Sequence, residues 1–201
     1  MTKTVSALYD TYGAARSAVS ALETAGIPHS DISIVANNSE SWHRDDRESN
    51  AADGAGTGAG VGAAVGGVGG LLTGLGMMAI PGVGPVVAAG WLIATAVGAA
   101  TGAAVGAATG GIIGSLTEAG IPENDANLYA EGVRRGGSLV TARVVDERAS
   151  EVQAILNRNK SVDLNARGRL YRGEGWSRFD PASPAYTADQ VAKERARYTA
   201  L

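Results

Sequence analysis

Hydrophobic and polar residues alternate weakly over residues 3–9 and again over 31–36, which predicts two short strands. Between them lies a helical pattern that begins at a polar residue, Asp10, suited to cap a helix, and ends at Gly26. Three apolar residues at helical spacing form one face of this helix: Ala15, Val19 and Leu22. Residues 1–36 therefore predict a βαβ unit.

A second half-domain is expected over residues 118–165. It opens with a helix from Pro122 to about Arg135, which glycines then stop, and continues with a strand over 138–145. A further helix, capped by Asp146, carries Ala149, Val152 and Leu156 on one face, and a short final strand is expected over 161–165. The two βαβ units together predict an α+β fold, a ferredoxin-like sandwich of four strands with two helices on one face.

The region between the two halves has a different composition. Residues 37–53 are polar and without periodicity, as expected of a flexible linker, and the next 64 residues, 54–117, contain no Asp, Glu, Lys, Arg or His. This apolar insert predicts two helices, Gly54–Ile80 and Val86–Leu116, each long enough to cross a bilayer. The turn between them would be formed by Pro81, Gly82, Gly84 and Pro85.

Glycine recurs in the insert with a four-residue period, although glycine in a helix costs about 1 kcal/mol relative to alanine. A row of this kind lets two helix backbones approach closely, which predicts a glycine-zipper helical hairpin. The expected packing row is Gly54, Gly58, Gly62, Gly66, Gly70, Gly74, Gly90, Gly98, Gly102, Gly106, Gly110 and Gly114. An aliphatic ridge beside it consists of Val61, Val65, Val68, Leu72 and Leu75.

Two environments are compatible with this hairpin. In the first it is embedded in the cytoplasmic membrane with both chain termini in the cytoplasm, and membrane lipid is a partner. In the second the hairpins are buried inside a soluble cytoplasmic oligomer or shell-like particle. In both the protein associates with itself, and the uncharged ridge is the surface that has to be covered.

Residues 166–201 form an arm of different character, with aromatic residues and prolines ahead of a last helix. Thr187 and Gln190 make a capping box for that helix, expected from Ala188 to about Tyr198. Three aromatic residues are expected to anchor the arm in a protein groove: Trp176, Phe179 and Tyr186. The sequence leaves open whether the arm docks on its own chain or on a neighbour.

Composition argues against most catalytic chemistry. The chain has 201 residues, a net charge of −3 and no cysteine, so the sequence predicts no nucleic-acid partner, and thiolate chemistry is excluded. Lysine is missing from residues 4–159, which excludes a P-loop, and neither histidine has a plausible catalytic partner. We expect a protein that is not an enzyme, with no cofactor, metal or small-molecule substrate.

Charged residues at the two ends of the helix over 122–135 have a structural interpretation. Glu123 and Asp125 in its first turn, and Arg134 and Arg135 in its last, complement the helix dipole. The sharper alternative for the two arginines is contact with anionic lipid.

Three segments resemble the bacterial general stress proteins that carry a heat-induced or low-temperature-induced stress domain. They are the opening "VSALYD" with "DISIV", the insert motif "AIPGVGPVVAAG", and "EGVRRGGSLVTARV" after the insert, so that the resemblance covers about residues 4–164. It implies a stress-associated protein without a defined biochemical activity, of a kind often labelled as a membrane protein from hydropathy, and it brings no catalytic residues. The resemblance does not extend to the arm.

Overall fold

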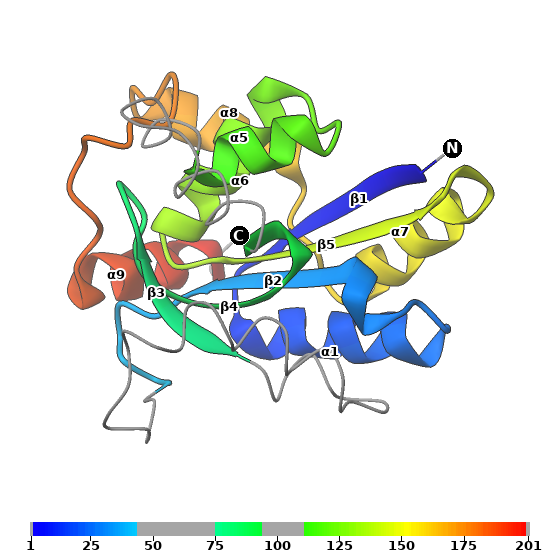
Figure 1. Cartoon of the computed structure of the whole chain (residues 1–201). Helices are drawn as coiled ribbons and strands as arrows, with labels where there is room; N and C mark the ends of the chain where they lie inside the picture. Colours follow the sequence, from blue (N-terminus) through cyan, green and yellow to red (C-terminus); the bar gives the residue numbers. More distant parts are fainter. Residues whose placement is uncertain (1, 44–74, 94–110, 200–201) are drawn as a thin grey trace, which may run out of the picture.

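The computed structural model describes residues 2–43, 75–93 and 111–199 and contains one five-stranded sheet (Figure 1). The strand order is β1-β5-β2-β4-β3, and every neighbouring pair is antiparallel. The strands are β1 (Thr2–Tyr9), β2 (Ile32–Asn37), β3 (Gly76–Ile80), β4 (Gly84–Gly90) and β5 (Ser138–Val145). The helices are α1 (Tyr12–Thr24), α5 (Gly111–Glu118), α6 (Glu123–Arg134), α7 (Ala149–Arg158), α8 (Leu164–Gly173) and α9 (Ala188–Thr199), with 3-10 turns η1 (His29–Asp31) and η2 (Asp146–Arg148).

The connection from β1 through α1 to β2 forms a split βαβ unit. Both strands pair antiparallel with β5, which lies between them, so β1 and β2 run parallel to each other. The expected α+β class is therefore present, but as a five-stranded sheet and not as the four-stranded ferredoxin-like sandwich.

The final strand expected over 161–165 is absent. One backbone hydrogen bond, from the Val162 N–H to the Leu8 carbonyl at 2.8 Å, joins this segment to β1. The chain then turns into α8, because the Asp163 carboxylate accepts a hydrogen bond from the Ala166 N–H at 2.9 Å and caps the new helix.

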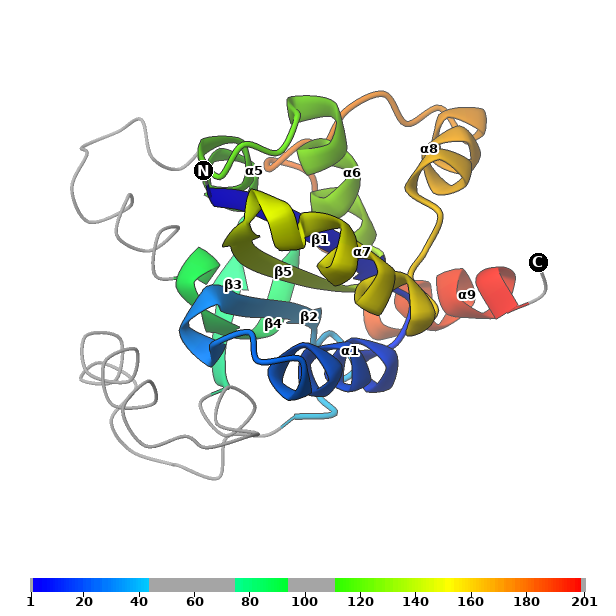
Figure 2. The ribbon, with the colours of Figure 1, turned by 90° about the vertical axis from the view of Figure 1, so that its right-hand side faces the viewer.

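Helices cover both faces of the sheet (Figure 2). Strand residues alternate between the faces: Ala7 and Val140 belong to the core under α1 and α7, whereas Leu8 and Leu139 belong to the core under α5 and α6. The sequence predicted helices on one face only. In the structure α6, which is the helix expected over 122–135, and the short α5 cover the opposite face.

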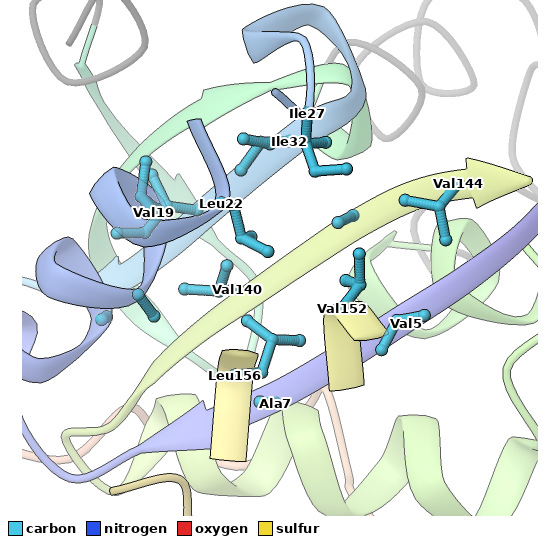
Figure 3. Close-up of a cluster of buried hydrophobic side chains, with 14 of the residues drawn as sticks. Val5, Ala7, Val19, Leu22, Ile27, Ile32, Val140, Val144, Val152 and Leu156 are labelled. Carbon is cyan, nitrogen blue, oxygen red and sulfur yellow. The ribbon is translucent and has the colours of Figure 1, made fainter. Parts of the chain in front are cut away.

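The core under α1 and α7 is built from aliphatic residues of four strands and two helices (Figure 3). Its helical members are those that the spacing predicted, and Val19, Leu22, Val152 and Leu156 are all fully buried. Tyr9 closes one end of this core by donating its hydroxyl hydrogen to the Leu156 carbonyl at 3.0 Å. Burial raises the pKa of Tyr9, so it remains a neutral donor.

Two strands occupy positions where the sequence predicted helix. Residues 76–80 are β3 and residues 84–90 are β4, so the turn at Pro81 joins strands and not helices. Without β4, strand β2 would lie at an edge of the sheet. Pairing of β4 with β2 satisfies the backbone groups of both strands, and the β-branched Val86 and Val87 suit a strand. Within the described part of the insert, the expected helix is found at residues 91–93 and in α5, which begins at Gly111.

The start of the expected linker is part of the folded domain. Asn37 is the last residue of β2, and its side-chain amide nitrogen donates to the Val133 carbonyl at 3.0 Å. The side-chain amide nitrogen of Asn38 donates to the His43 carbonyl, and its side-chain oxygen accepts from the His43 N–H. These buried amides give the polar chain internal hydrogen-bond partners, which explains why residues 37–43 are not a simple linker.

Two helix starts also differ from the prediction. Thr11, and not Asp10, caps α1, since the Thr11 hydroxyl accepts from the Ala14 N–H at 3.2 Å. Asp146 begins η2, so α7 starts three residues later, at Ala149.

Candidate functional site

The C-terminal part of the chain crosses the α5 and α6 side of the molecule and is the feature that the sequence left most open. We call residues 174–199 the strap: a stretch without helix or strand follows α8, and α9 follows that stretch. In this structure the strap docks on its own chain. Its main contacts fall into three groups.

Phe179 forms the first contact. Its ring is 5% exposed and belongs to the core under α6. The Phe179 N–H donates to the Asn127 side-chain oxygen at 3.2 Å, and the Asn127 amide in turn donates to the Glu123 carbonyl at 2.7 Å. A buried aromatic ring with a bonded backbone amide fixes the strap against α6.

The second contact is with the turn between β3 and β4. Gly82 has φ of +73°, and a Cβ atom there would lie 2.7 Å from the Pro181 Cα and 2.9 Å from the Asp180 carbonyl oxygen. Gly84 has φ of +99°, and its Cβ would lie 2.7 Å from the Ala185 Cβ. Glycine is required at both positions, because only a chain without a Cβ lets the strap approach this closely.

The third contact is a network of ion pairs, which we call the ionic latch. It consists of three arginines and three glutamates: Glu131, Arg134, Arg135, Glu174, Glu194 and Arg197. The first three come from α6 and its C-terminal end, and the other three come from the strap.

Arg135 lies at the centre of the ionic latch, and its side chain is 7% exposed. It donates from Nε to Glu131 at 2.7 Å and from one terminal nitrogen to Glu174 at 2.6 Å. Glu194 lies 3.5 Å from the same nitrogen. The guanidinium therefore bridges α6 to both ends of the strap.

Aromatic rings flank the latch arginines. The guanidinium carbon of Arg135 lies 4.1 Å from the ring centre of Tyr171, and that of Arg134 lies 5.0 Å from the ring centre of Tyr186. Cation–π contact at these distances adds attraction that is little weakened by the surrounding water when the groups are buried. Tyr198 donates its hydroxyl hydrogen to Glu194 and lies against Arg167.

The charges of the ionic latch stabilise one another. Burial lowers the pKa of Arg135, but its hydrogen bonds to Glu131 and Glu174 outweigh this effect and raise the pKa. Burial raises the pKa of Glu174, but the hydrogen bonds from Arg135 and Arg197 outweigh it and hold that pKa below its usual range. The six side chains carry three formal positive and three formal negative charges, so the charges of the ionic latch balance, as expected of a structural contact.

An open hollow of about 450 Å³ lies beside the Phe179 contact. Its lining is mostly apolar and comes from the end of β3, the start of α5 and the strap: Ile80, Pro81, Gly111, Ile112, Ile113 and residues 177–181. The strap and both described portions of the apolar insert therefore border the same hollow.

The three expected anchors of the arm all lie in the strap, and each makes a different contact. Phe179 is buried, Tyr186 is half-buried over Arg134, and Trp176 packs edge-on against Tyr171 with ring centres 5.8 Å apart. Arg134 and Arg135, for which lipid contact was the sharper alternative, face glutamates of their own chain.

Most of the expected glycine row and ridge lies outside the described residues. These are Gly54, Gly58, Gly62, Gly66, Gly70, Gly74, Gly98, Gly102, Gly106 and Gly110, with Val61, Val65, Val68 and Leu72. Gly90 is described and does not lie in a helix: its φ is +98°, and a Cβ there would lie 2.2 Å from the Ile32 carbonyl oxygen. Gly114 lies in α5 with no described atom within 4 Å of a Cβ, and Leu75 packs partly buried against the core under α1.

Sequence reasoning did not identify the glutamates of the latch. Glu131 and Arg135 are four residues apart on one helix, which is a detectable pairing signal, but such pairs are usually exposed and weak. What makes this pair important is its burial beneath α9, and that depends on contacts between distant parts of the chain.

Other chemistry is limited among the described ranges 2–43, 75–93 and 111–199. Within them, no group of three or more His, Cys, Asp or Glu side chains could hold a metal ion. No helix in the same ranges is both long enough and apolar enough to cross a membrane.

Comparison with known proteins identifies the first part of the chain. Residues 4–83 match the family model of the heat induced stress protein YflT domain. No curated protein and no solved structure gives a significant match. The match confirms the resemblance to heat-induced stress proteins over these residues, and it indicates no catalytic family.

Proposed function

Starting from the heat-induced stress protein YflT domain at residues 4–83, we propose that this chain is a non-enzymatic structural protein that associates with copies of itself. The associating surfaces are the two uncharged, glycine-rich stretches at 54–74 and 94–110. The five-stranded sheet with its helices and the strap serve as the folded body that carries both stretches.

The observation that supports this most directly is the orientation of the β3–β4 hairpin. Gly76 at the start of β3 pairs with Ala88 near the end of β4, so the two strands have their open ends side by side. The chain therefore enters β3 from residue 74 and leaves β4 toward residue 94 at the same end of the hairpin. Two stretches with the same four-residue glycine period start from neighbouring strands, which favours their joint action as one surface.

The exposed character of β3 adds to this argument. Its residues are uncharged, and Met77 is 48% exposed. Within the described residues β3 pairs only with β4 and lies at the edge of the sheet. An uncharged edge strand is a surface that readily meets another chain.

The charge balance of the ionic latch is an independent argument for a structural function. Its six charged groups bond one another, and their formal charges balance, so the cluster holds the strap and leaves no net charge to attract a substrate. We therefore assign the ionic latch a structural role.

The experiment that tests this function is the substitution Gly66→Leu in the full chain. A leucine in the middle of the glycine row adds bulk where close approach is needed, so the mass measured by size exclusion with light scattering should fall to that of the monomer or a small oligomer. The matched control is Gly173→Leu at the exposed end of α8, where a Cβ meets nothing within 4 Å, and its assembly should be unchanged.

An unchanged assembly in Gly66→Leu would reject the glycine-row model. The same preparation also separates the two environments. Protein that sediments with membranes and requires detergent for release would indicate that the stretches enter lipid, whereas a large species in the detergent-free supernatant would indicate a protein assembly.

A further inference from the structure

Methionine supplies all of the sulfur in this chain, which contains three methionines and no cysteine. Two of them, Met77 and Met78, are neighbours on β3 and point to opposite faces of the sheet. Met77 is 48% exposed, whereas Met78 is partly buried against the core under α5 and α6. An oxidant in solution therefore reaches Met77 more readily than Met78.

The sulfur of Met77 lies against a buried hydrogen-bond donor. The side-chain nitrogen of Asn38 lies 3.4 Å from the Met77 Sδ, and Asn38 is only 4% exposed. The same nitrogen donates to the His43 carbonyl at 3.0 Å, so one of its hydrogens meets a strong acceptor and the other meets a thioether. A thioether sulfur is a weak acceptor, which leaves part of the bonding capacity of this buried amide unused.

This contact joins two parts of the chain that are far apart in sequence. The Asn38 side chain holds the backbone of His43, the last described residue before 44–74, through both its nitrogen and its oxygen. Strand β3 begins at Gly76, just after the same stretch. The contact between Asn38 and Met77 therefore links the point where residues 44–74 leave the body to the strand by which the chain returns.

We propose that Met77 is a site of oxidation by peroxides and that its sulfoxide accepts a hydrogen bond from Asn38. A lone pair of the thioether sulfur attacks one oxygen of hydrogen peroxide, and the O–O bond breaks as the S–O bond forms. The proton of the transferred oxygen passes to the departing hydroxide, which leaves as water. Sulfur loses two electrons, and the peroxide gains them.

Oxidation at this position strengthens a contact instead of breaking one. The sulfoxide oxygen is a stronger acceptor than the thioether, and it is bonded to an atom that already lies 3.4 Å from the donor nitrogen. A better-held Asn38 also holds the His43 N–H more firmly, which donates to the Asn38 side-chain oxygen at 3.1 Å. We expect exchange of the His43 amide hydrogen to slow by about fivefold. This inference concerns contacts within one chain and does not depend on the proposed self-association.

Hydrogen peroxide added to the full chain tests the site. The variants Met78→Leu and Met77→Leu each keep one of the two sulfur atoms on β3, and peptide mass spectrometry follows the gain of one oxygen atom. The sulfur of Met77 should be oxidised several-fold faster than that of Met78. Equal rates, or faster oxidation of Met78, would overturn the assignment of the site.

Hydrogen exchange of the peptide containing residues 38–43 tests the bond to Asn38. Exchange should slow in oxidised Met78→Leu, and also without oxidant in Met77→Gln, whose side-chain carbonyl supplies a similar acceptor. In Met77→Leu, peroxide should leave exchange unchanged. The control is Asn38→Asp, which removes the donor but keeps an oxygen for the His43 N–H, so oxidation should not slow exchange there. Unchanged or faster exchange in oxidised Met78→Leu, or equal slowing in Asn38→Asp, would overturn the proposed bond.

Discussion

At the scale of single residues, Arg135 has the largest predicted effect on stability. Its removal leaves Glu131, whose side chain is 1% exposed, with only the more distant Arg134 as a partner. A buried charge that loses its partner destabilises a protein by about 3–5 kcal/mol. We expect Arg135→Met to lower the free energy of unfolding by about 3 kcal/mol, measured by urea unfolding with circular dichroism.

The control for this prediction is Arg169→Met. Arg169 is also an arginine of the C-terminal arm, but it is exposed on α8, and substitutions at exposed sites change stability by about 0.5 kcal/mol or less. Similar losses in the two variants would mean that the ionic latch contributes no more than a surface charge.

Gly82 provides a second residue-scale prediction, with Gly26 as its matched comparison. Both have positive φ, +73° and +80°, so alanine strains the backbone at either position by about 1–2 kcal/mol. Only at Gly82 does the new Cβ also collide with the strap, at the Pro181 Cα. Gly82→Ala should therefore be the more destabilising and should alone alter Trp176 fluorescence; equal effects on stability and fluorescence would contradict the strap contact.

At the scale of one element, docking of the strap should depend on pH. The pKa of Glu174 is lower in the folded protein than in the unfolded chain, because Arg135 and Arg197 donate hydrogen bonds to it. Its stabilising contribution is therefore complete above the usual glutamate pKa of about 4.3 and is lost as the pH falls through the folded value. Acidification from pH 7 to about 3 should release the strap, as followed by Trp176 fluorescence.

The Glu174→Gln variant tests the origin of this pH dependence. It should dock more weakly at neutral pH and should lose less docking on acidification than the parent. An identical pH profile in parent and variant would assign the effect to other carboxylates.

At the scale of the whole molecule, the strap should separate from the body before the five-stranded sheet and its helices unfold. The sheet has a core on each face, whereas the strap is held by one buried ring, the turn contact and the latch. Removing the ring by Phe179→Ala costs about 3–5 kcal/mol when the site is fully buried. In this variant the Trp176 transition in urea should come well before the circular dichroism transition.

Arg178→Ala is the control for that separation, since the Arg178 side chain is 70% exposed and should leave the transitions nearly unchanged. Coincident transitions in Phe179→Ala would show that the strap and the five-stranded sheet with its helices unfold as one unit.

The pattern of the sequence was sufficient for elements whose partners are local. The faces of α1 and α7, and the strands β1, β2 and β5, follow from spacing alone, because each buries one apolar side. The same four residues, "AGIP", follow two helices at 25–28 and 119–122 and end both in the same way. The Ile27 N–H bonds the Leu22 carbonyl and the Ile121 N–H bonds the Leu116 carbonyl, both at 3.0 Å.

Long-range partners explain the failures. Residues 84–90 are uncharged and rich in alanine and valine, which fits helix and strand alike, and only the open edge of β2 favours the strand. The strap shows the same limit: its aromatic anchors were visible in the sequence, but Glu131 and Glu194 acquire their role only when α9 lies beside α6.

The orientation of the β3–β4 hairpin also has a mechanical consequence. Tension on the stretches before residue 75 and after residue 93 acts on the same end of the hairpin, so it opens the β3–β4 pair one hydrogen-bonded rung at a time, from Gly76 toward the turn. The turn, held beneath Pro181 and Ala185, lies at the far end and yields last. Load carried between associated copies would thus reach the strap only after β3 has been stripped from the sheet.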